Sequence, residues 1–161
     1  MTLDERAQNA RDMLFERYDV LNAHWLQVEE QLTAFHIPRS VSYAYKKYPD
    51  PDGAEGGMIH KRLGLRKIRG KWRICYCLYY YDAFPDMEDW TPITECSAEI
   101  RVEAARHVEG LREAIVKSAE SFISRVDKAI SSLATAVGLP TSTESQGSLA
   151  DRAKLNGQHQ Q

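Results

Sequence analysis

The sequence predicts an α+β fold: two long antiparallel helices flank a small three-stranded antiparallel β-meander, and a disordered C-terminal tail follows. Three observations lead to this prediction. The central residues 61–81 alternate apolar and polar side chains with the period of two that strands show. The flanking residues 3–35 and 98–137 repeat apolar side chains at helical spacing. The last residues, 141–161, are rich in Ser, Thr, Gln and Gly, a composition typical of disorder.

The first helix is expected over residues 3–35. Thr2 and Glu5 have the spacing of a capping box, in which each side chain accepts a hydrogen bond from a backbone amide of the first turn. From Leu14 onward the apolar positions alternate spacings of four and three residues, which is typical of a coiled-coil seam. The candidate helix-seam residues are Leu21, Trp25, Val28 and Leu32. We expect them to pack on the C-terminal helix of the same chain, with a coiled coil between chains as the alternative.

Three strands are expected, over about residues 40–47, 61–68 and 72–81. Apolar residues alternate along each of them, and many are β-branched or aromatic. Gly70 marks the turn between the last two strands. A two-residue loop such as Gly70-Lys71 places both apolar rows on one face, whereas an odd loop would move one row to the other face. We therefore predict a two-residue loop.

The other face of this hairpin is basic and aromatic. Between His60 and Arg73 there are seven Lys or Arg residues and no acid. Such a surface can neutralise phosphates and stack bases, as in many single-strand binders. The candidate polyanion-binding residues are Arg62, Arg66, Lys67, Arg69, Lys71 and Arg73, with Trp72, Tyr79 and Tyr81 for stacking. The alternative is a face that only keeps the sheet soluble, and the acidic segment 82–89 could cover and neutralise it.

The C-terminal helix is expected over residues 98–137, capped by Ser97 or Thr94. Its apolar positions lie close to 3.6 residues apart, so it is amphipathic. At 1.5 Å per residue it would be roughly 60 Å long, more than the core of a domain of this size needs. Gly138, followed closely by Pro140, is a strong helix stop.

Composition narrows the function classes. A chain of 161 residues fits one domain, residues 1–140, plus the tail. The net charge of −2 gives no general attraction to nucleic acid or to an anionic membrane, and no apolar run is long enough to span a bilayer. The N-terminus lacks the features of a secretory signal, so we expect a cytoplasmic protein without disulfides. No motif indicates a catalytic residue, a metal or a cofactor.

Two functions remain. The first is a non-enzymatic interaction or adaptor protein, whose long helices mediate homo-oligomerisation or bind a protein partner. The second is binding of single-stranded nucleic acid or another polyanion through the basic hairpin, residues 60–81. An enzyme is a third and weaker hypothesis. No motif in the chain identifies a protein family.

Overall fold

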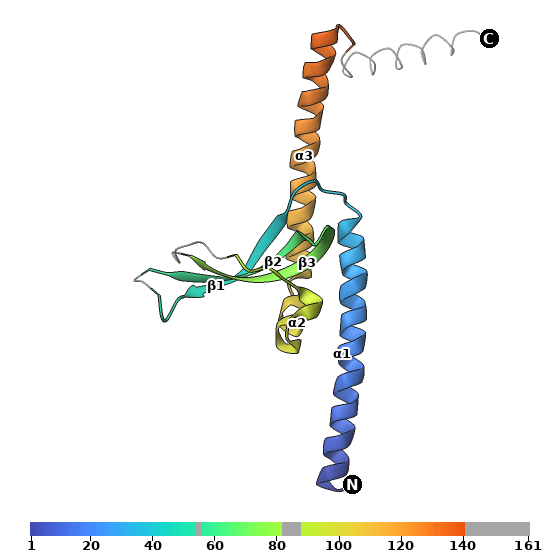
Figure 1. The fold of residues 1–161 in the computed structure, drawn as a ribbon, viewed down its shortest axis with the longest axis vertical. Coiled ribbons are helices and arrows are strands. Elements are labelled where there is room, and N and C mark those ends of the chain that lie inside the picture. Colours follow the sequence, from blue (N-terminus) through green and yellow to red (C-terminus); the bar gives the residue numbers. More distant parts are fainter. Residues whose placement is uncertain (54–55, 82–87, 141–161) are drawn as a thin grey trace, which may run out of the picture. The chain divides into compact units, whose positions relative to one another are not determined.

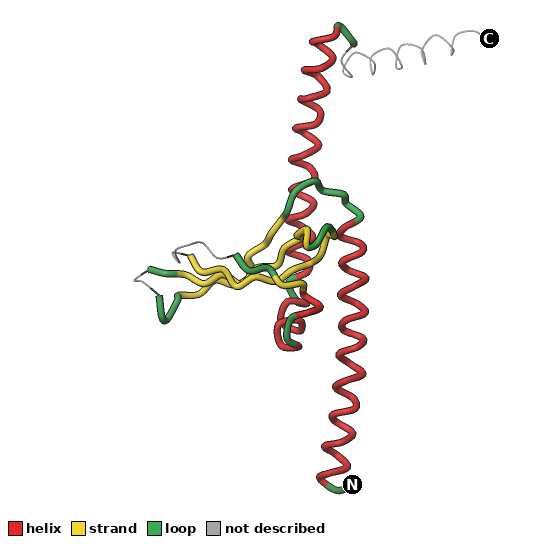
Figure 2. The backbone as a smooth tube through the Cα atoms, in the orientation of Figure 1, coloured by secondary structure: helices red, strands yellow, loops and turns green. Residues whose placement is uncertain are grey.

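The computed structural model describes residues 1–53, 56–81 and 88–140. Within them the chain forms three α-helices, a short 3-10 helix and a four-stranded antiparallel sheet (Figure 1, Figure 2), so the α+β prediction is confirmed. The chain divides into two compact units, Met1–Ser118 and Ala119–Gln161. The tail expected to be disordered, residues 141–161, lies outside the described residues.

Helix α1 spans Leu3–Thr33 and begins with the predicted capping box. The Thr2 amide donates to Oε2 of Glu5 at 2.6 Å, and the Glu5 amide donates to Oγ1 of Thr2 at 3.2 Å. The helix ends slightly before the expected residue 35. Beyond it, His36 has a left-handed φ of 49°, which a right-handed helix cannot continue, and Pro38 follows.

The sheet has four strands in sequence order, not the expected three. The strands are β1 (Val41–Pro49), β2 (Met58–Ile68), β3 (Lys71–Tyr81) and β4 (Thr91–Pro92). The extra strand, β4, pairs antiparallel with β3 through Cys75 opposite Pro92 and Tyr76 opposite Thr91. Only two residues long and containing a proline, β4 carries no alternation from which the sequence could have indicated it.

The β2–β3 hairpin has the predicted two-residue loop, but the loop lies one residue earlier than expected. Ile68 pairs with Lys71, so the loop is Arg69-Gly70 and not Gly70-Lys71. Arg69 has a φ of 48° and Gly70 a φ of 83°, both positive as in the type I′ turn that suits the twist of paired strands. Because the loop keeps an even length, the two apolar rows still share one face of the sheet.

The single helix expected over 98–137 is divided into α2 (Ala98–Ala105) and α3 (Val108–Val137), preceded by the 3-10 helix η1 (Ile93–Glu95). Ser97 caps α2, as predicted: its Oγ accepts a hydrogen bond from the Ile100 amide at 3.4 Å. The helical spacing of the apolar residues continues through residues 106–107, so nothing in the repeat itself indicates the break.

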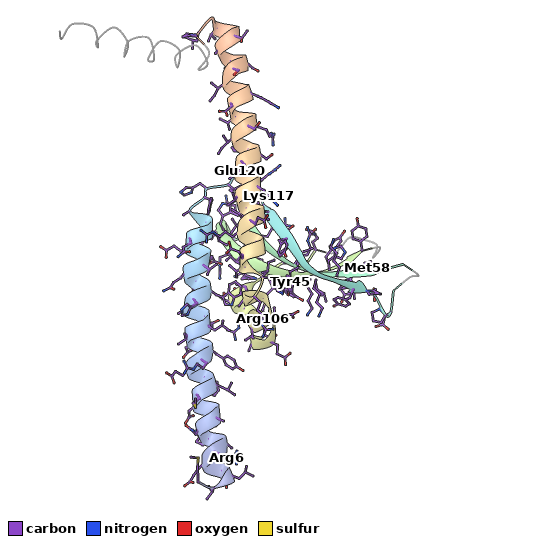
Figure 3. All side chains as sticks on the ribbon, turned by 180° about the vertical axis from the view of Figure 1, so that it is seen from behind. Arg6, Tyr45, Met58, Arg106, Lys117 and Glu120 are labelled. Carbon is purple, nitrogen blue, oxygen red and sulfur yellow. The ribbon has the colours of Figure 1, made fainter. Side chains whose placement is uncertain are left out.

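Contacts with strand β1 explain where the helix breaks. The ring of His107 stacks on Tyr45 at 4.4 Å between centroids, beside the junction where Arg106 is labelled (Figure 3). A Cβ on Gly110 would lie 2.3 Å from the ring of Tyr43, so only glycine lets α3 approach β1 this closely. The bend therefore depends on side chains of a distant strand.

Helix α1 packs on β3, η1 and α2 and does not pair with α3 along its length. Tyr18 lines one hollow with α2, and Val28 lines the next with Val108 at the start of α3. Phe35 lines a third with Arg112, one turn further along α3. Because these neighbours advance in the same order, the two helices run in the same sense within this unit (Figure 1), not antiparallel as expected. The expected antiparallel arrangement assumed that three strands alone connect the two helices. In the structure β4 and α2 also lie between them and change the direction of the chain further.

The core of the first unit is built by the apolar face of the sheet, the C-terminal half of α1, η1 and the start of α3. Its buried residues include Trp25, Leu32, Leu63, Leu65, Ile74, Ile93, Leu111 and Ile115. In contrast, every residue of the first four turns of α1, around Arg6 in Figure 3, is exposed. The sheet therefore holds α1 by one half only.

In the second unit the described residues are the distal part of α3 and its end. Gly138 has a φ of 69°, and the Leu139 amide donates to the carbonyl of Ala134 at 2.8 Å. This is the pattern of a Schellman motif, so the predicted helix stop is confirmed. Among the described residues, no helix is both long enough and apolar enough to cross a membrane.

Candidate functional site

The basic hairpin is the surface that the sequence singled out, and the structure divides its charges into two groups. At one group, acidic side chains from other elements pair with the cations. At the other, beside the β2–β3 turn, the cations are exposed and form no ion pair with any described residue. Acidic side chains of the protein neutralise the first group, whereas described residues leave the charges of the second group without a counter-charge.

Arg62 and Arg66 belong to the paired group, and they enclose Trp90. The guanidinium of Arg66 lies 4.1 Å from the centre of the indole ring, and that of Arg62 lies 5.9 Å from it. Glu88 forms ion pairs with both arginines, at 3.5 Å to Arg62 and 3.1 Å to Arg66. The indole Nε1 of Trp90 also donates to Glu88, at 3.0 Å. These two predicted phosphate ligands are thus already partnered.

Glycine in β2 makes room for this cluster. A Cβ on Gly64 would lie 2.8 Å from the ring of Trp90, so the indole packs directly on the backbone of the sheet. Glycine inside a strand often marks such a close approach, and this is the signal from which a covering aromatic ring could have been inferred. Trp90 was missed as a site residue, whereas Glu88 belongs to the acidic segment 82–89 that was considered as a cover of the basic face.

Arg73 is paired with helix α1. Its Nε donates to Glu29 Oε1 at 2.8 Å, and its terminal nitrogen donates to Thr94 Oγ1 at 2.9 Å. The other carboxylate oxygen of Glu29 accepts from the Ile74 amide, also at 2.8 Å. This amide lies on the edge of β3 beyond the short β4, so Glu29 accepts the hydrogen bond that a longer neighbouring strand would accept. The contact attaches α1 to the sheet.

Lys61 completes the paired group. Its Nζ lies 2.7 Å from Oε2 of Glu103 on α2.

The question left open by the sequence, whether an acidic segment covers the basic face, has a partial answer. Glu88 does neutralise two arginines, while the rest of the segment, residues 82–87, lies outside the described residues.

The remaining cations, Lys67, Arg69 and Lys71, are all exposed, and none of them has a hydrogen bond or ion pair to a described residue. Lys67 lies opposite Trp72, on the apolar-row face of the hairpin. Arg69 lies in the turn, and Lys71 begins β3. Among the predicted basic residues, these three are the ones that no described residue neutralises.

The predicted stacking residues are not brought together. Trp72 lies on the face opposite to that of Tyr79 and Tyr81. The Tyr79 ring lies 5.5 Å from the Arg62 guanidinium and meets Tyr81 edge to face at 5.8 Å. Both tyrosines also contact His60, and burial is the main cause that lowers the pKa of that imidazole. These rings form a local cluster at the end of the hairpin that lies opposite the turn.

The cysteines are protonated at neutral pH. Burial raises the pKa of Cys75 to about 12 and that of Cys96 to about 11, and it also raises the pKa of Cys77. A protonated thiol is a weak nucleophile and a weak metal ligand. Within residues 1–53, 56–81 and 88–140, no group of three or more His, Cys, Asp or Glu side chains is arranged to hold a metal ion.

The candidate helix-seam residues lie on one side of α1. Trp25 and Leu32 are buried, whereas Leu21 and Val28 are partly exposed. They face β3, η1, α2 and the start of α3, and not the length of the C-terminal helix that we expected. The seam is therefore mainly part of the core.

A second apolar stripe lies on distal α3, and it is exposed. Its large side chains are between 39% and 67% exposed. The stripe residues are Ile123, Val126, Ile130, Leu133 and Val137. We call this set the α3 stripe. The sequence assigned these residues to an ordinary amphipathic helix, but only the structure reveals that the described chain leaves them uncovered.

Comparison with models of protein families, with curated proteins and with solved structures finds no match for this chain.

Proposed function

We propose that this chain is a non-enzymatic interaction protein that self-associates through the α3 stripe. The observation that carries the proposal is a continuous row of exposed apolar side chains on the distal part of α3. Contiguous apolar surface on a soluble protein usually marks an interaction site. The α3 stripe extends over four helical turns without a charged residue in the row.

The spacing of the α3 stripe supports a coiled coil. From Ile123 to Val137 the intervals are three, four, three and four residues. This is a heptad repeat, and it keeps one narrow face of a helix turned toward a partner helix. The polar residues between these positions, such as Lys128 and Ser131, lie on the outer side of the helix.

The residue types support a second copy of the same helix as the partner. In heptad notation the a positions are Ile123, Ile130 and Val137, and the d positions are Val126 and Leu133. β-branched residues at all three a positions, together with leucine at one of the two d positions, match the pattern that favours parallel two-stranded coils. In a parallel dimer each layer consists of one residue and its symmetry mate, so the pattern is complementary to itself.

The energy is sufficient for a weak dimer. Burying an apolar side chain completely contributes about 1.5–3 kcal/mol, so a half-exposed residue would gain roughly 1 kcal/mol. Five such residues from each chain would give roughly 10 kcal/mol, which exceeds the lower part of an association cost of about 4–15 kcal/mol. At a cost of about 4 kcal/mol the balance of roughly 6 kcal/mol corresponds to a Kd of tens of micromolar, so we expect a weak dimer and not a permanent one.

Light scattering across about 10 to 100 µM protein tests the proposal. The wild-type mass should rise from monomer toward dimer. Ile130→Asp should hold the protein at monomer mass, because it would place two unpaired carboxylates face to face in an apolar layer. The matched control is Ser131→Asp, which adds the same charge to the outer side of the helix and should dimerise as the wild type does.

Cross-linking tests the parallel orientation. In a Cys96→Ser background, Ile123→Cys should form a disulfide with its symmetry mate, because parallel helices place residue 123 of both chains in one layer. Arg125→Cys, on the outer side, should cross-link far less. A monomer mass throughout the concentration range would overturn the proposal, as would dimerisation that Ile130→Asp leaves unchanged.

A further inference from the structure

We propose that a cleft beside the β2–β3 turn binds a phosphate group. The cleft has a volume of about 450 Å³, within the range of ligand sites, which are roughly 300–1,000 Å³. Its floor comes from the hairpin and its wall from the segment that contains β4 and η1, and both contribute exposed residues to the rim. The residues that line it are Ile68, Arg69, Lys71, Arg73, Trp90, Thr91, Pro92 and Glu95.

The rim supplies charge that no described residue neutralises. Arg69 and Lys71 are exposed and have no ion pair within the described residues, in contrast with the arginines around Trp90. They are the residues directly before and after Gly70, so the tight turn keeps them close together. As far as the described part of the chain extends, the cleft thus has two unpaired cations beside it that can bind an anion.

The wall of the cleft is held in place. Trp90 is fixed by Arg66 and by its hydrogen bond to Glu88. Thr91 pairs with β3, and Pro92 is buried. Arg73 at the floor is held by Glu29 and Thr94. A cleft with prearranged walls loses little conformational freedom when a ligand binds.

The charges favour phosphate over a carboxylate. Glu95, exposed on the rim, offsets part of the positive charge, so a singly charged anion would gain little. A phosphate group carries close to two charges and three strong acceptor oxygens. An arginine can bind two of these oxygens at once, and a lysine acts as a point charge beside them. The phosphate could come from a free phosphorylated compound or from the backbone of a single-stranded nucleic acid.

The turn offers a clean variant. Both central residues have positive φ, and asparagine followed by glycine is the preferred sequence for such a turn. Arg69→Asn therefore removes the charge and also favours the native backbone. Its melting temperature should equal or exceed that of the wild type, so a loss of binding could not be attributed to unfolding.

Titration followed by NMR amide shifts is the experiment. Inorganic phosphate should produce saturable shifts centred on residues 68–73 and 90–95. Arg69→Asn and Lys71→Gln should each weaken binding by about tenfold, because each removes a charge-assisted contact. Glu95→Gln should tighten binding by about twofold or more, because it removes the opposing charge from the rim.

The matched control is Lys67→Gln. It removes the same charge from the same hairpin, but Lys67 lies on the other face and does not line the cleft. Its binding should stay within about twofold of the wild type. Equal weakening by Lys67→Gln and Arg69→Asn would indicate a diffuse charge effect and overturn the proposal. The proposal would also be overturned by non-saturable shifts, or by acetate binding as tightly as phosphate.

Two further probes distinguish the source of the phosphate. If adenosine monophosphate binds as tightly as a single-stranded oligothymidylate, the ligand is a free phosphorylated compound. If the oligothymidylate binds more tightly through the same residues, the phosphate belongs to a single strand. In that case Arg69→Asn should reduce the slope of log affinity against log salt by about 0.7. This site and the α3 stripe are tested independently, since neither Arg69→Asn nor Lys71→Gln touches α3.

Discussion

The C-terminal half of α1 and the distal part of α3 carry similar apolar repeats, but described residues cover only the first repeat. Trp25 and Leu32 on α1 are 2% and 3% exposed, whereas Ile130 and Leu133 on α3 are 49% and 67% exposed. The sheet and α2 cover the α1 repeat. Such a repeat defines an apolar face of a helix without defining the partner of that face. The sheet is the partner of α1, and we propose a second chain for α3.

The largest effect should come from breaking the covered repeat. Trp25→Ala should lower the free energy of unfolding by about 3–5 kcal/mol, because it removes a buried ring and leaves a cavity. Thermal and urea melts would measure this. The control is Leu26→Ala at the next position, where the side chain is 53% exposed and the loss should be about 0.5 kcal/mol or less. Equal losses at both positions would contradict the assignment of the covered face.

The polar attachment of α1 should have the next largest effect. Glu29 is 13% exposed and accepts from both Arg73 and the Ile74 amide. Glu29→Gln should cost about 1–3 kcal/mol, toward the lower end because Arg73 is a quarter exposed and water can solvate it. The exposed neighbour Glu30 provides the control variant, Glu30→Gln, for which we expect almost no change. A melt that Glu29→Gln leaves unaltered would show that apolar packing alone holds α1.

The exposed repeat should behave in the opposite way. Ile130→Ala should change the melting temperature of dilute protein little, because half of the side chain is already in water. It should instead remove the rise of melting temperature with protein concentration that self-association causes in the wild type. Calorimetry at low and high concentration measures both quantities. A large loss at low concentration would mean that the residue is packed within its own chain.

Acidification should have the smallest effect on stability, and this effect should arise in the sheet and not in the α3 stripe. Burial, with Lys47 and Arg62 nearby, lowers the pKa of His60 below 6.5, so the folded sheet favours the neutral imidazole. The resulting stability is complete above pH 6.5 and is lost as the pH falls below this value. His60→Gln should flatten the acid loss in thermal melts, whereas Ile130→Ala should leave it intact. If His60→Gln lost stability with falling pH as steeply as the wild type does, the loss would belong to other titratable groups.

Much of the fold could be predicted because its signals are local. Thr2 and Glu5 form the expected cap, and Gly138 ends the last helix as its sequence context indicates. The even hairpin loop also followed from alternation, since one slip would expose a whole apolar row. In each case, residues a few positions apart supply both the signal and the contact. The position of the loop was one residue off because Arg69, not Lys71, takes the left-handed conformation beside Gly70.

The candidate site was less predictable, because its properties depend on distant residues. The basic stretch was evident from sequence, but the partners of Arg62, Arg66 and Arg73 come from other elements. Nothing in the spacing of charges tells which cations meet an acid and which stay free. The cleft beside the turn likewise exists only because β4 brings Trp90 and its neighbours to the hairpin.

Local signals were enough to predict most of the elements: helices from apolar spacing and caps, strands from alternation, and a basic hairpin from composition. Tertiary contacts set the fourth strand, the shared direction of α1 and the first part of α3 within the first unit, and the break before α3. They also set which apolar repeat the described residues bury. These two kinds of property depend on interactions over different distances along the sequence. Backbone preferences and periodicity act over a few residues, whereas burial and charge pairing depend on which surfaces meet after the chain has folded.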